Sequence, residues 1–561
     1  MQQDERFEPY YFHEQGFDSL EEIEDWFEWE IPAQFNIADA VCDQWAARTP
    51  DRVALYIHNP DGTPETYTFA ELENYANQLA NALSDNGVEP GDRIAINGTQ
   101  RLESLVGNIA AFKLGAVAIP LTVLLGTDGL AYRLTDSQPS VFLADEAAIG
   151  AVRSVADNVD ALSTIITYGD YDRGEEVNFW EAISGKPTDF DTVSTDATDP
   201  AFIVYTSGTT GEPKGVVHAH QHLLGGVTQF VSLQCHDTSA DQVVRTVAEW
   251  SWIMSLPGMV LPALFYGMPA VGYSSRGFEP ETEFAVIDRF DITHLNLPPT
   301  AVRMMMQIDD PAETYDLSSL QSFSTGGESA DAGIIEWVVD TFPNASFLEG
   351  YGASEFGGLI SDDPAMGYEH RIGYFGIPSV GHEIAVLDRD TGEPIDTPGT
   401  IGELAVRAEG NPVVFEEYLN KPERTDAAFT DGWFLTDDLV SRDEDGYVQF
   451  HSRSDDLIIS SGYRIAPKEI ESALLGHPSV QHVGVIGVPD ETRGEIPMAY
   501  VEVIDSVTGN DELKTELQDY VKEHLAKHKY PRRVAFTDDL PTTTTGKVRR
   551  ESLRERAGVS E

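Results

Sequence analysis

Residues 205–215 read YTSGTTGEPKG, a run of glycines and hydroxyl side chains that contains one lysine. The run follows the apolar residues 201–204, which are typical of a buried strand. Glycines let backbone N–H groups turn toward an anion, hydroxyls donate further hydrogen bonds, and Lys214 adds a positive charge. The run therefore predicts a phosphate-binding loop at the end of a strand. The alternative is a flexible Gly/Ser/Thr turn without a ligand.

The same run does not fit the P-loop of kinases and GTPases. That motif, G-x-x-x-x-G-K-[ST], requires a second glycine five residues after the first, and the fifth residue after Gly208 is Pro213. The sequence thus favours a nucleotide-using protein of another class.

Six further strings that could do chemistry follow the phosphate loop. Each is weak alone, because glycine, hydroxyl and acidic residues are common in turns. Their number and order make them hard to attribute to chance. They are STGGES (324–329), LEGYGASE (348–355), WFLTDD (433–438), RSDD (453–456), SGYRI (461–465) and PTTTTGK (541–547), the first two each following a predicted strand.

Alternating strands and helices must position these strings. Such alternation predicts an α/β fold with parallel sheets covered by helices. The strands are expected at 93–96, 117–121, 201–204, 270–271, 293–297 and 322–325, and helices at 102–114 and 281–290.

The rhythm changes near residue 370. Strands at 383–387, 402–407 and 446–450, separated by turns, predict a small all-β, barrel-like subdomain over about 370–454. Helices at 469–475 and 511–527 with strands at 480–488 and 497–503 then predict a compact α+β domain. We expect an N-terminal extension on the surface at 1–34, a large domain at 35–454 and a C-terminal domain at 455–561.

The composition is strongly acidic, with 95 Asp and Glu against 36 Lys and Arg and a net charge of −59. We interpret this as a hydrated surface that stays soluble at high salt, where screening reduces self-repulsion. A surface that attracts basic partners is the alternative. Nucleic acid is excluded as a partner, because the chain has no basic stripe to neutralise phosphates.

Two cysteines without metal-ligand spacing argue against a disulfide framework or a zinc site. The first residues lack the basic and apolar regions of a signal peptide, and no apolar run is long enough to span a membrane. The sequence therefore predicts a cytoplasmic protein.

Taken together, the strings resemble the adenylate-forming superfamily, which includes acyl-CoA synthetases, luciferases and peptide-synthetase adenylation domains. The resemblance runs from about residue 35 to 554 and is strongest to medium-chain acyl-CoA synthetases. The cues for that subgroup are FN at 35–36, DQWA at 43–46, SSGYRI at 460–465, RGE at 493–495 and KYPR at 529–532.

The resemblance implies a two-step ligase that uses ATP, Mg²⁺, coenzyme A and a small carboxylic acid. Carboxylate and ATP give an acyl-adenylate and pyrophosphate, and CoA then gives acyl-CoA and AMP. Lys547 is the implied catalytic lysine, and Glu355 the implied catalytic and metal-binding carboxylate. The implied ATP-binding residues are Thr206, Ser207, Gly208, Thr209, Thr210, Gly211, Lys214, Gly327, Glu328, Ser329, Glu349, Gly350, Tyr351, Gly352, Ala353, Ser354, Asp438 and Arg453.

Members of this superfamily rotate a mobile C-terminal domain between the two steps, and the resemblance places the hinge at Asp455. For coenzyme A it implies a second set of residues, in which arginines can meet phosphates. The set is Ser461, Gly462, Tyr463, Arg464, Arg493, Tyr530 and Arg532.

Three positions depart from the superfamily pattern. Ser354 stands for the usual Thr, Asp437 for a Gly and Ser452 for a Gly, which puts loop geometry in doubt but removes no named contact. Acetate-specific relatives carry a Trp at the position of Gly352, so its glycine predicts an acid larger than acetate. Trp252 is a second candidate for the acyl pocket, or else a core residue.

The sequence leaves three other functions open. An adenylation enzyme that loads a carrier protein is disfavoured because the chain ends soon after Lys547 and carries the CoA-type SGYR string. A nucleotide sensor without activity is disfavoured because Lys547 and Glu355 are both present. An acetate or aryl-acid CoA ligase is a further alternative. His218, His220 and His294 receive no role.

Overall fold

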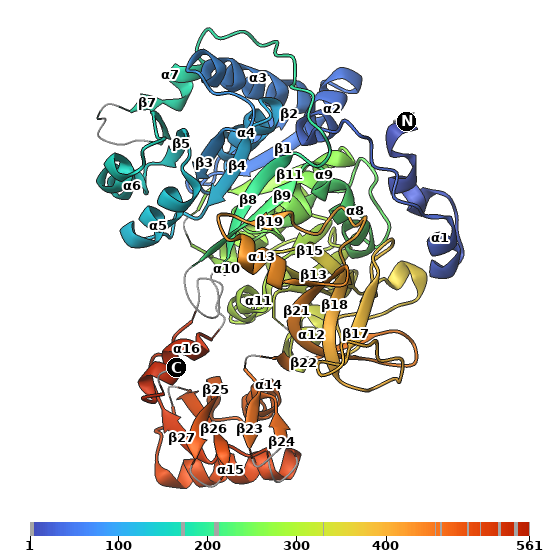
Figure 1. Cartoon of the computed structure of the whole chain (residues 1–561), viewed down its shortest axis with the longest axis vertical. Helices are drawn as coiled ribbons and strands as arrows, with labels where there is room; N and C mark the ends of the chain where they lie inside the picture. Colours follow the sequence, from blue (N-terminus) through green and yellow to red (C-terminus); the bar gives the residue numbers. More distant parts are fainter. Residues whose placement is uncertain are drawn as a thin grey trace. The chain divides into compact units, whose positions relative to one another are not determined.

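A computed structural model gives the structure of the chain and describes residues 5–169, 174, 176–206, 213–275, 277–328, 330–454, 456–460, 463–490, 493–504, 506–525, 529–542 and 548–559. The chain divides into two compact units. The N-terminal unit comprises residues 1–207, 213–383 and 408–429, and the C-terminal unit comprises 208–212, 384–407 and 430–561. Figure 1 labels their elements.

The N-terminal unit contains an eight-stranded sheet in the order β19-β9-β8-β4-β3-β5-β6-β7. The six neighbouring strands β8, β4, β3, β5, β6 and β7 are parallel. At one edge, β9 pairs with β8 and β19 pairs with β9, both antiparallel. The bounds are β3 (Arg93–Asn97), β4 (Val117–Leu121), β5 (Val141–Asp145), β6 (Thr164–Tyr168), β7 (Val177–Asn178), β8 (Pro200–Thr206), β9 (Lys214–Ala219) and β19 (Glu417–Tyr418).

A nine-stranded sheet of the same unit has the order β16-β15-β14-β13-β12-β10-β11-β1-β2. Its centre is parallel, and β2, β15 and β16 are antiparallel additions. The bounds are β1 (Val53–His58), β2 (Pro64–Thr68), β10 (Val244–Thr246), β11 (Ala270–Tyr273), β12 (His294–Asn296), β13 (Ser322–Gly326), β14 (Ser346–Ala353), β15 (Gly357–Ser361) and β16 (Ile377–Pro378).

Helices cover both faces of these sheets. Successive side chains of a strand point to opposite faces, and here both faces carry apolar side chains that the helices bury. In β3, for example, Ile94 and Ile96 join the large central core, whereas Ala95 joins the outer core under α5 and α6. The central core contains α3, α4, α8 and α9, and α10, α11 and α12 cover the other face of the nine-stranded sheet. The helices are η2 (Asp39–Asp43), α2 (Gln44–Arg48), α3 (Phe69–Asp85), α4 (Leu102–Lys113), α5 (Thr127–Ser137), α6 (Ile149–Val155), η3 (Ala156–Asn158), α7 (Phe179–Ile183), α8 (His222–Leu233), η4 (Leu256–Val260), α9 (Leu261–Phe265), α10 (Pro280–Phe290), α11 (Pro299–Met305), η5 (Pro311–Glu313), α12 (Ala332–Thr341), η6 (Pro364–Met366) and α13 (Pro422–Ala427).

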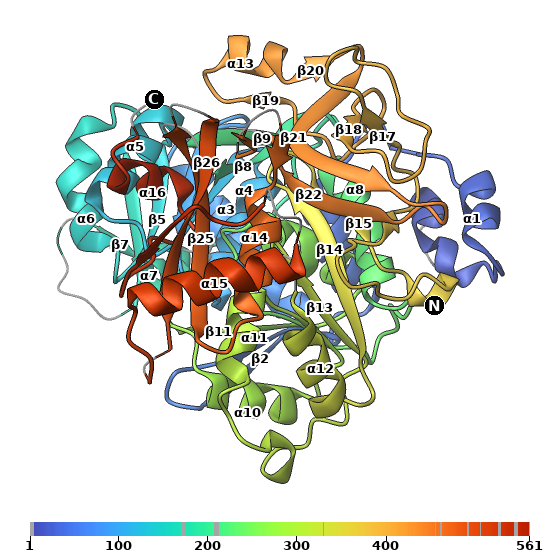
Figure 2. The same ribbon diagram turned by 90° about the horizontal axis from the view of Figure 1, so that it is seen from below.

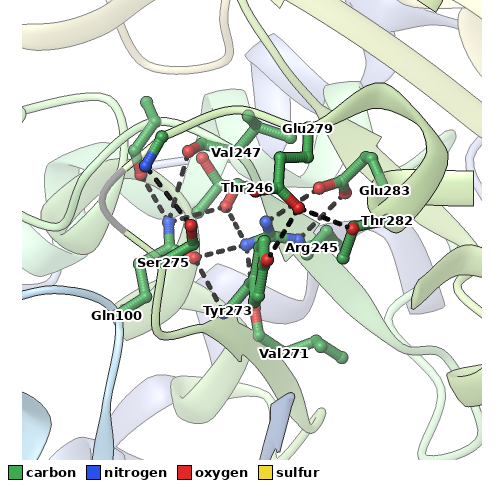
Figure 3. Close-up of polar contacts among 12 residues, drawn as sticks. Gln100, Arg245, Thr246, Val247, Val271, Tyr273, Ser275, Glu279, Thr282 and Glu283 are labelled. Carbon is green, nitrogen blue, oxygen red and sulfur yellow. Dashed lines mark hydrogen bonds and ion pairs between the residues drawn. The ribbon is translucent and has the colours of Figure 1, made fainter. Parts of the chain in front are cut away.

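A buried polar network connects the two sheets (Figure 3). Gln100, just after β3, donates to the carbonyl oxygens of Thr246 at 2.9 Å and Ala248 at 2.7 Å. Arg245 in β10 donates to the Gln100 amide oxygen and makes two 3.0 Å bonds to the carboxylate of Glu283 in α10. Because Arg245 and Glu283 are buried together and hydrogen-bonded, neither is left as an uncompensated charge.

The N-terminal segment differs from the expected surface extension. Helix η1 (Glu5–Glu14) inserts aromatic side chains into the central core of the N-terminal unit, and α1 (Leu20–Trp26) adds Ile23. Phe7, Tyr10 and Phe12 are fully buried, and Tyr10 and Phe7 contact Phe265 of α9 edge to face. The aromatic content of the segment, rather than its acidic charge, therefore decides where it lies.

The C-terminal unit contains two further sheets. One has the order β17-β18-β21-β20, with β22 on β21, and the other has the order β24-β23-β26-β25, with β27 on β26. The first comprises β17 (Ile384–Leu387), β18 (Gly402–Arg407), β20 (Phe429–Thr430), β21 (Trp433–Arg442) and β22 (Val448–Arg453). The second comprises β23 (Ile458–Ser460), β24 (Tyr463–Ile465), β25 (Val480–Asp490), β26 (Gly494–Val503) and β27 (Arg533–Phe536).

Helices cover both faces of the second sheet, and Figure 2 shows α15 lying along it. Residues of α14 (Pro467–Leu475) and α15 (Asp511–His524) share one core with Val483 and Val485 of β25. Leu553 of α16 (Arg550–Arg556) shares the other core with Ile486. A Cβ atom at Gly484 would lie 2.7 Å from side-chain atoms of Leu553 and Val548, so a glycine is needed for this close approach.

The predicted fold class, α/β with helix-covered parallel sheets and a small α+β region near the C-terminus, is confirmed. The boundary at Asp455 stays a prediction, and Asp455 lies outside the described residues. The compact units divide the chain differently, since they group residues 384–407 and 430–454 with the C-terminal sheet. Among the described residues, no helix is long and apolar enough to cross a membrane.

Candidate active site

The predicted phosphate loop joins two antiparallel strands of the N-terminal unit. Thr206 at the end of β8 pairs with Lys214 at the start of β9. The Tyr205 hydroxyl donates to an Asp136 carboxylate oxygen at 2.8 Å, and the Tyr132 hydroxyl donates to the Pro213 carbonyl oxygen at 2.9 Å. These contacts fix both ends of the loop, whose residues 207–212 lie outside the described part of the chain.

Lys214 lies beside Glu355, as a phosphate-binding lysine and a metal-binding carboxylate would. Its Nζ atom is 3.6 Å from Glu355 Oε1, and both side chains are about one-seventh exposed. The Tyr418 hydroxyl of β19 donates to the same Oε1 atom at 2.8 Å, and Lys214 Nζ lies 4.3 Å from the centre of the Tyr418 ring. A lysine, a carboxylate and a tyrosine hydroxyl therefore meet at one point, where anions and a cation could be held together.

The turn between β14 and β15 carries Glu355. The Phe415 N–H donates to the Glu355 carbonyl oxygen at 2.8 Å, and His218 Nε2 lies 2.8 Å from the Ser354 carbonyl oxygen. Burial lowers the pKa of His218 well below its ordinary value, so the ring is neutral and Nε2 carries its proton. Two neutral donors thus hold the backbone of this turn.

Gly352 has a structural reason to be glycine. A Cβ atom there would lie 2.0 Å from the Gly357 carbonyl oxygen, at the bulge where β14 and β15 shift register. The close approach of Gly357 accounts for a glycine at 352 in this chain, so the glycine does not by itself indicate a larger acyl pocket. Trp252 is half-buried in a turn before η4, and Ile253 next to it lies near Gly357.

The ends of β13 and β14 form a close-packed pair. Gly326 is paired with Gly350, and a Cβ at Gly326 would lie 2.8 Å from the Gly350 carbonyl oxygen. Gly327 follows with φ +83°, a left-handed conformation that favours glycine. Within the described residues, the buried Thr325 Oγ1 and Glu328 Oε1 atoms have no hydrogen-bond partner, which makes them available to a ligand.

Two residues of β14 that are predicted to bind the nucleotide have protein partners. Tyr351 is buried, and its ring stacks on Phe375 with centroids 5.0 Å apart. Glu349 is also buried; its carboxylate accepts from the Ala330 N–H at 3.3 Å and lies 4.0 Å from His370. The string 348–355 thus lies mostly within a strand instead of following one, since β14 extends to Ala353.

In the C-terminal unit, Asp438 and Arg453 are cross-strand partners on β21 and β22. Their side chains are 3.3 Å apart, and Asp438 is buried. Asp438 therefore lies in a strand and not in a turn. Asp437 has φ +61°, which explains why a glycine suits this position and shows that an aspartate can occupy it.

The predicted coenzyme A residues lie on the second sheet of the C-terminal unit and next to it. Ser460 of β23 pairs with Tyr463 of β24 and with Gly494 of β26. The backbone at Tyr463 and the residue that follows Arg493 therefore lie beside the same position of β23. Arg532 donates to the Tyr530 hydroxyl at 3.0 Å, and Lys522 Nζ lies 4.4 Å from the Tyr530 ring centre. This cationic cluster could meet phosphates.

A network of charges lies beside the segment that leads from residue 547 into α16. Arg550 donates to Asp456 at 2.8 Å, to both oxygens of Glu471 at 2.8 Å and to the Val485 carbonyl oxygen at 3.2 Å. Glu471 in turn accepts from the Val485 N–H at 2.8 Å. The two side chains therefore satisfy the N–H and the carbonyl oxygen of Val485 on the outer edge of β25.

Comparisons with known proteins give the family of the chain. The family described as AMP-binding enzyme matches residues 42–419, and its C-terminal domain matches residues 469–547. This chain belongs to the AMP-binding enzyme family.

An acyl-CoA ligase of Bacillus subtilis (strain 168) is 33% identical over 94% of this chain and 96% of its own length. Human mitochondrial acyl-coenzyme A synthetase ACSM4 is 31% identical over 94% of this chain and 91% of its own. Among solved structures, the anthranilate CoA ligase AuaEII in complex with anthranoyl-AMP is 27% identical, with a TM-score of 0.85 over 94% of this chain and 98% of that one. ATP-bound MatB from Rhodopseudomonas palustris is 28% identical, with a TM-score of 0.81 over 93% and 98%. The predicted superfamily and the enzyme class, an AMP-forming acyl-CoA ligase, are confirmed.

Two residues of the candidate site in this AMP-binding enzyme stand outside the strings that the sequence singles out. Tyr418 carried no signal, because it stands in a short edge strand far from the recognised strings. His218 was noted without a role, although it stands four residues after Lys214 on the same strand.

Several predicted site residues lie outside the part of the chain that the structure describes. They are Ser207, Gly208, Thr209, Thr210, Gly211, Ser329, Asp455, Ser461, Gly462 and Lys547, and for Tyr463 and Arg464 only the backbone is described.

Proposed function

We propose that this enzyme is an ATP-dependent ligase that joins coenzyme A to a short- or medium-chain fatty acid larger than acetate. The reaction class rests on family membership, and the chain length rests on the sequence resemblance. First, a carboxylate oxygen attacks the α-phosphate of ATP, the bond between the α- and β-phosphates breaks, and pyrophosphate leaves. Then the thiol of CoA attacks the acyl carbonyl, AMP leaves with the bonding electrons, and the thiol proton is released.

The contact among Lys214, Glu355 and Tyr418 carries the proposal. Adenylation brings two anions together, so charge stabilisation must supply most of the rate acceleration. Lys214 at the end of the phosphate loop would hold the departing pyrophosphate, and its 3.6 Å separation from Glu355 puts both groups within reach of one triphosphate. Tyr418 orients Glu355 through its hydroxyl.

Glu355 would hold Mg²⁺. One carboxylate with water and phosphate oxygens suits this ion, which keeps several waters in most protein sites. When bound, the ion neutralises negative charge on the phosphates. Glu355 fits the role because its support comes from a tyrosine hydroxyl and backbone contacts, and Lys214 stands at 3.6 Å.

The remaining assignments follow the resemblance. The paired strand ends at Gly326 and Gly350, together with Tyr351, would hold adenine. Among the described residues, the buried oxygens of Thr325 and Glu328 have no hydrogen-bond partner, which supports a polar ligand there. Asp438 with Arg453 would bind the ribose. Lys547 would contact the α-phosphate during adenylation, and rotation at Asp455 would then exchange it for the coenzyme A residues.

An assay of half-reactions tests the function. The enzyme is incubated with ATP, Mg²⁺ and a panel of acids (acetate, butyrate, hexanoate, octanoate, benzoate and anthranilate), with and without CoA. CoA-dependent AMP release is expected, with a higher kcat/KM for butyrate or hexanoate than for acetate. A preference for acetate overturns the chain-length proposal, preference for benzoate or anthranilate indicates an aryl-acid ligase, and no release with any acid contradicts ligase activity.

Replacing Lys547 by alanine tests whether this lysine acts in adenylation and not in thioester formation. Lys547→Ala is expected to abolish acid-dependent ATP–pyrophosphate exchange and to spare thioester formation from a supplied acyl-adenylate. Equal loss of both steps would contradict the role given to Lys547.

A further inference from the structure

Strand β9 contacts the Glu355 turn at two points. Successive side chains of a strand alternate between its faces, so Lys214 and His218 lie on the same face of β9. Lys214 lies beside the Glu355 carboxylate, and His218 Nε2 lies 2.8 Å from the carbonyl oxygen of the preceding residue, Ser354. One strand therefore sets both the lysine and the turn that carries the carboxylate.

The surroundings of His218 fix its ring. The imidazole is fully buried, stacks on Phe202 with centroids 4.9 Å apart and meets His222 at 4.4 Å. The ring is neutral and the acceptor at Nε2 is a carbonyl oxygen, so Nε2 carries the single proton and Nδ1 is unprotonated. Nδ1 is buried and has no hydrogen-bond partner among the described residues.

The unpartnered ring nitrogen does not by itself assign a role to His218, since the neighbouring buried His220 also has one among the described residues. A buried polar atom without a partner costs stability, and a phenylalanine or methionine would fill the same space without that cost. The one polar interaction of the ring that the structure describes is the bond to Ser354. Its effect is therefore concentrated on the turn next to Glu355.

We propose that His218 is a positioning residue for adenylation, which holds the Ser354–Glu355 turn so that Glu355 meets the metal–triphosphate at a set distance from Lys214. The inference rests on the proposed function and adds a residue to it. Removing a residue that orients a metal ligand without touching the metal typically lowers metal affinity or activity by about 10- to 100-fold.

His220 is a matched internal control. It is equally buried and lies two residues further on, but its Nδ1 accepts from the Ile37 N–H at 3.2 Å and its ring meets Phe112. It therefore reports what the loss of a buried histidine does without any contact to the Glu355 turn.

The test compares His218→Met with His218→Gln, because the two side chains have similar size and only glutamine can donate to Ser354. Binding of Mn²⁺ in the presence of a non-hydrolysable ATP analogue is measured by electron paramagnetic resonance, and adenylation by ATP–pyrophosphate exchange. His218→Met is expected to weaken Mn²⁺ binding and to slow exchange about tenfold or more, whereas His218→Gln recovers most of both. Thioester formation from a supplied acyl-adenylate stays near the wild-type rate in both variants.

His220→Met is expected to leave Mn²⁺ affinity unchanged, even where it lowers thermal stability. Equal Mn²⁺ affinity in the Met and Gln variants of His218, or the same loss in His220→Met, would overturn the inference. If His218→Met does not fold, as judged by circular dichroism, the result for His218→Gln decides. Mn²⁺ affinity and exchange within about threefold of wild type support the donor role. A loss of tenfold or more contradicts it. Wild-type enzyme that shows no acid-dependent exchange would instead refute the proposed function.

Discussion

The regions around Glu355 and around Arg550 hold charged side chains in different ways. Glu355 is supported by a tyrosine hydroxyl, and its turn by a backbone N–H and the neutral imidazole of His218. Arg550 is held by the carboxylates of Asp456 and Glu471, whose side chains are mostly buried. Lys214 Nζ lies 3.6 Å from the Glu355 carboxylate, so the hydrogen bonds described at Glu355 and its turn come from neutral donors, whereas Arg550 is fixed by two carboxylates at 2.8 Å.

This difference follows from what each region must do. A carboxylate that binds a metal ion must be held in place and still have room for the ion, and at Glu355 neutral donors make the short contacts while Lys214 stands at 3.6 Å. A guanidinium that holds elements together works best when its donors are all engaged. Burial alone would lower the pKa of Arg550, but Glu471 and Asp456 outweigh it and raise the pKa above its ordinary value. The contrast predicts that Glu355 matters for rate and Arg550 for stability.

The largest effect is expected at Glu355. Glu355→Gln keeps the size of the side chain and its contact with Tyr418 but removes the negative charge that would meet Mg²⁺. Adenylation should fall about 100- to 1000-fold, as when one main charge-stabilising group is lost, and thioester formation from supplied acyl-adenylate should change little. ATP–pyrophosphate exchange measures the first step. Glu417→Gln, an exposed carboxylate beside Tyr418, is the control and should retain exchange. A change below about threefold in Glu355→Gln would contradict the metal-binding role.

Several parts of this arrangement could be predicted from the sequence. The strands at 93–96 and 201–204 and the helix at 281–290 are found within a few residues of their expected bounds, because apolar runs and Pro280 give clear local signals. The glycine- and hydroxyl-rich run indicates Lys214, the resemblance indicates Glu355, and the structure places the two side by side. The phosphate loop itself stays a prediction over residues 207–212.

Contacts between segments far apart in the chain could not be predicted. Tyr418 reaches Glu355 only because β19 adds to the edge of the eight-stranded sheet beside β9. The close approach at Gly352 comes from the neighbouring strand β15, so the sequence suggested an open pocket where the structure has a backbone contact. The N-terminal aromatic residues likewise enter a core formed mainly by later segments.

The neutral histidines of the N-terminal unit predict a loss of stability in acid. Burial lowers the pKa of His220 to about 3 and the pKa values of His222 and His382 to about 4, whereas an unfolded histidine titrates near 6.5. The unfolded state therefore gains protons that the folded state cannot take. The stability that each ring contributes is complete above pH 6.5 and is lost as the pH falls toward the folded value. At pH 5 the loss is about 2 kcal/mol per ring.

His220→Asn tests this sign, because asparagine can still accept from the Ile37 N–H but does not titrate. Relative to wild type, the variant should gain about 2 kcal/mol between pH 7.5 and pH 5. Urea unfolding followed by tryptophan fluorescence measures it, since seven of the eight tryptophans (Trp26, Trp29, Trp45, Trp180, Trp250, Trp252 and Trp337) lie in the N-terminal unit. A difference between variant and wild type that does not change with pH would contradict the prediction.

The smallest effect is expected from Arg550→Lys. A lysine keeps the charge, but a single ammonium cannot reach Asp456, Glu471 and the Val485 carbonyl oxygen with the geometry of a guanidinium. The local cost should be about 1–2 kcal/mol, below that of deleting a fully buried partner because Arg550 is about one-fifth exposed. Hydrogen exchange of the peptide 480–490, read by mass spectrometry, should show faster opening of β25. Arg556→Lys, on an exposed pair 3.7 Å from Asp539, is the control and should cost less than about 0.5 kcal/mol. Because both carboxylates are mostly screened from water, the Arg550→Lys effect should persist in about 1 M salt, whereas an effect that vanishes there would place Arg550 among ordinary surface pairs.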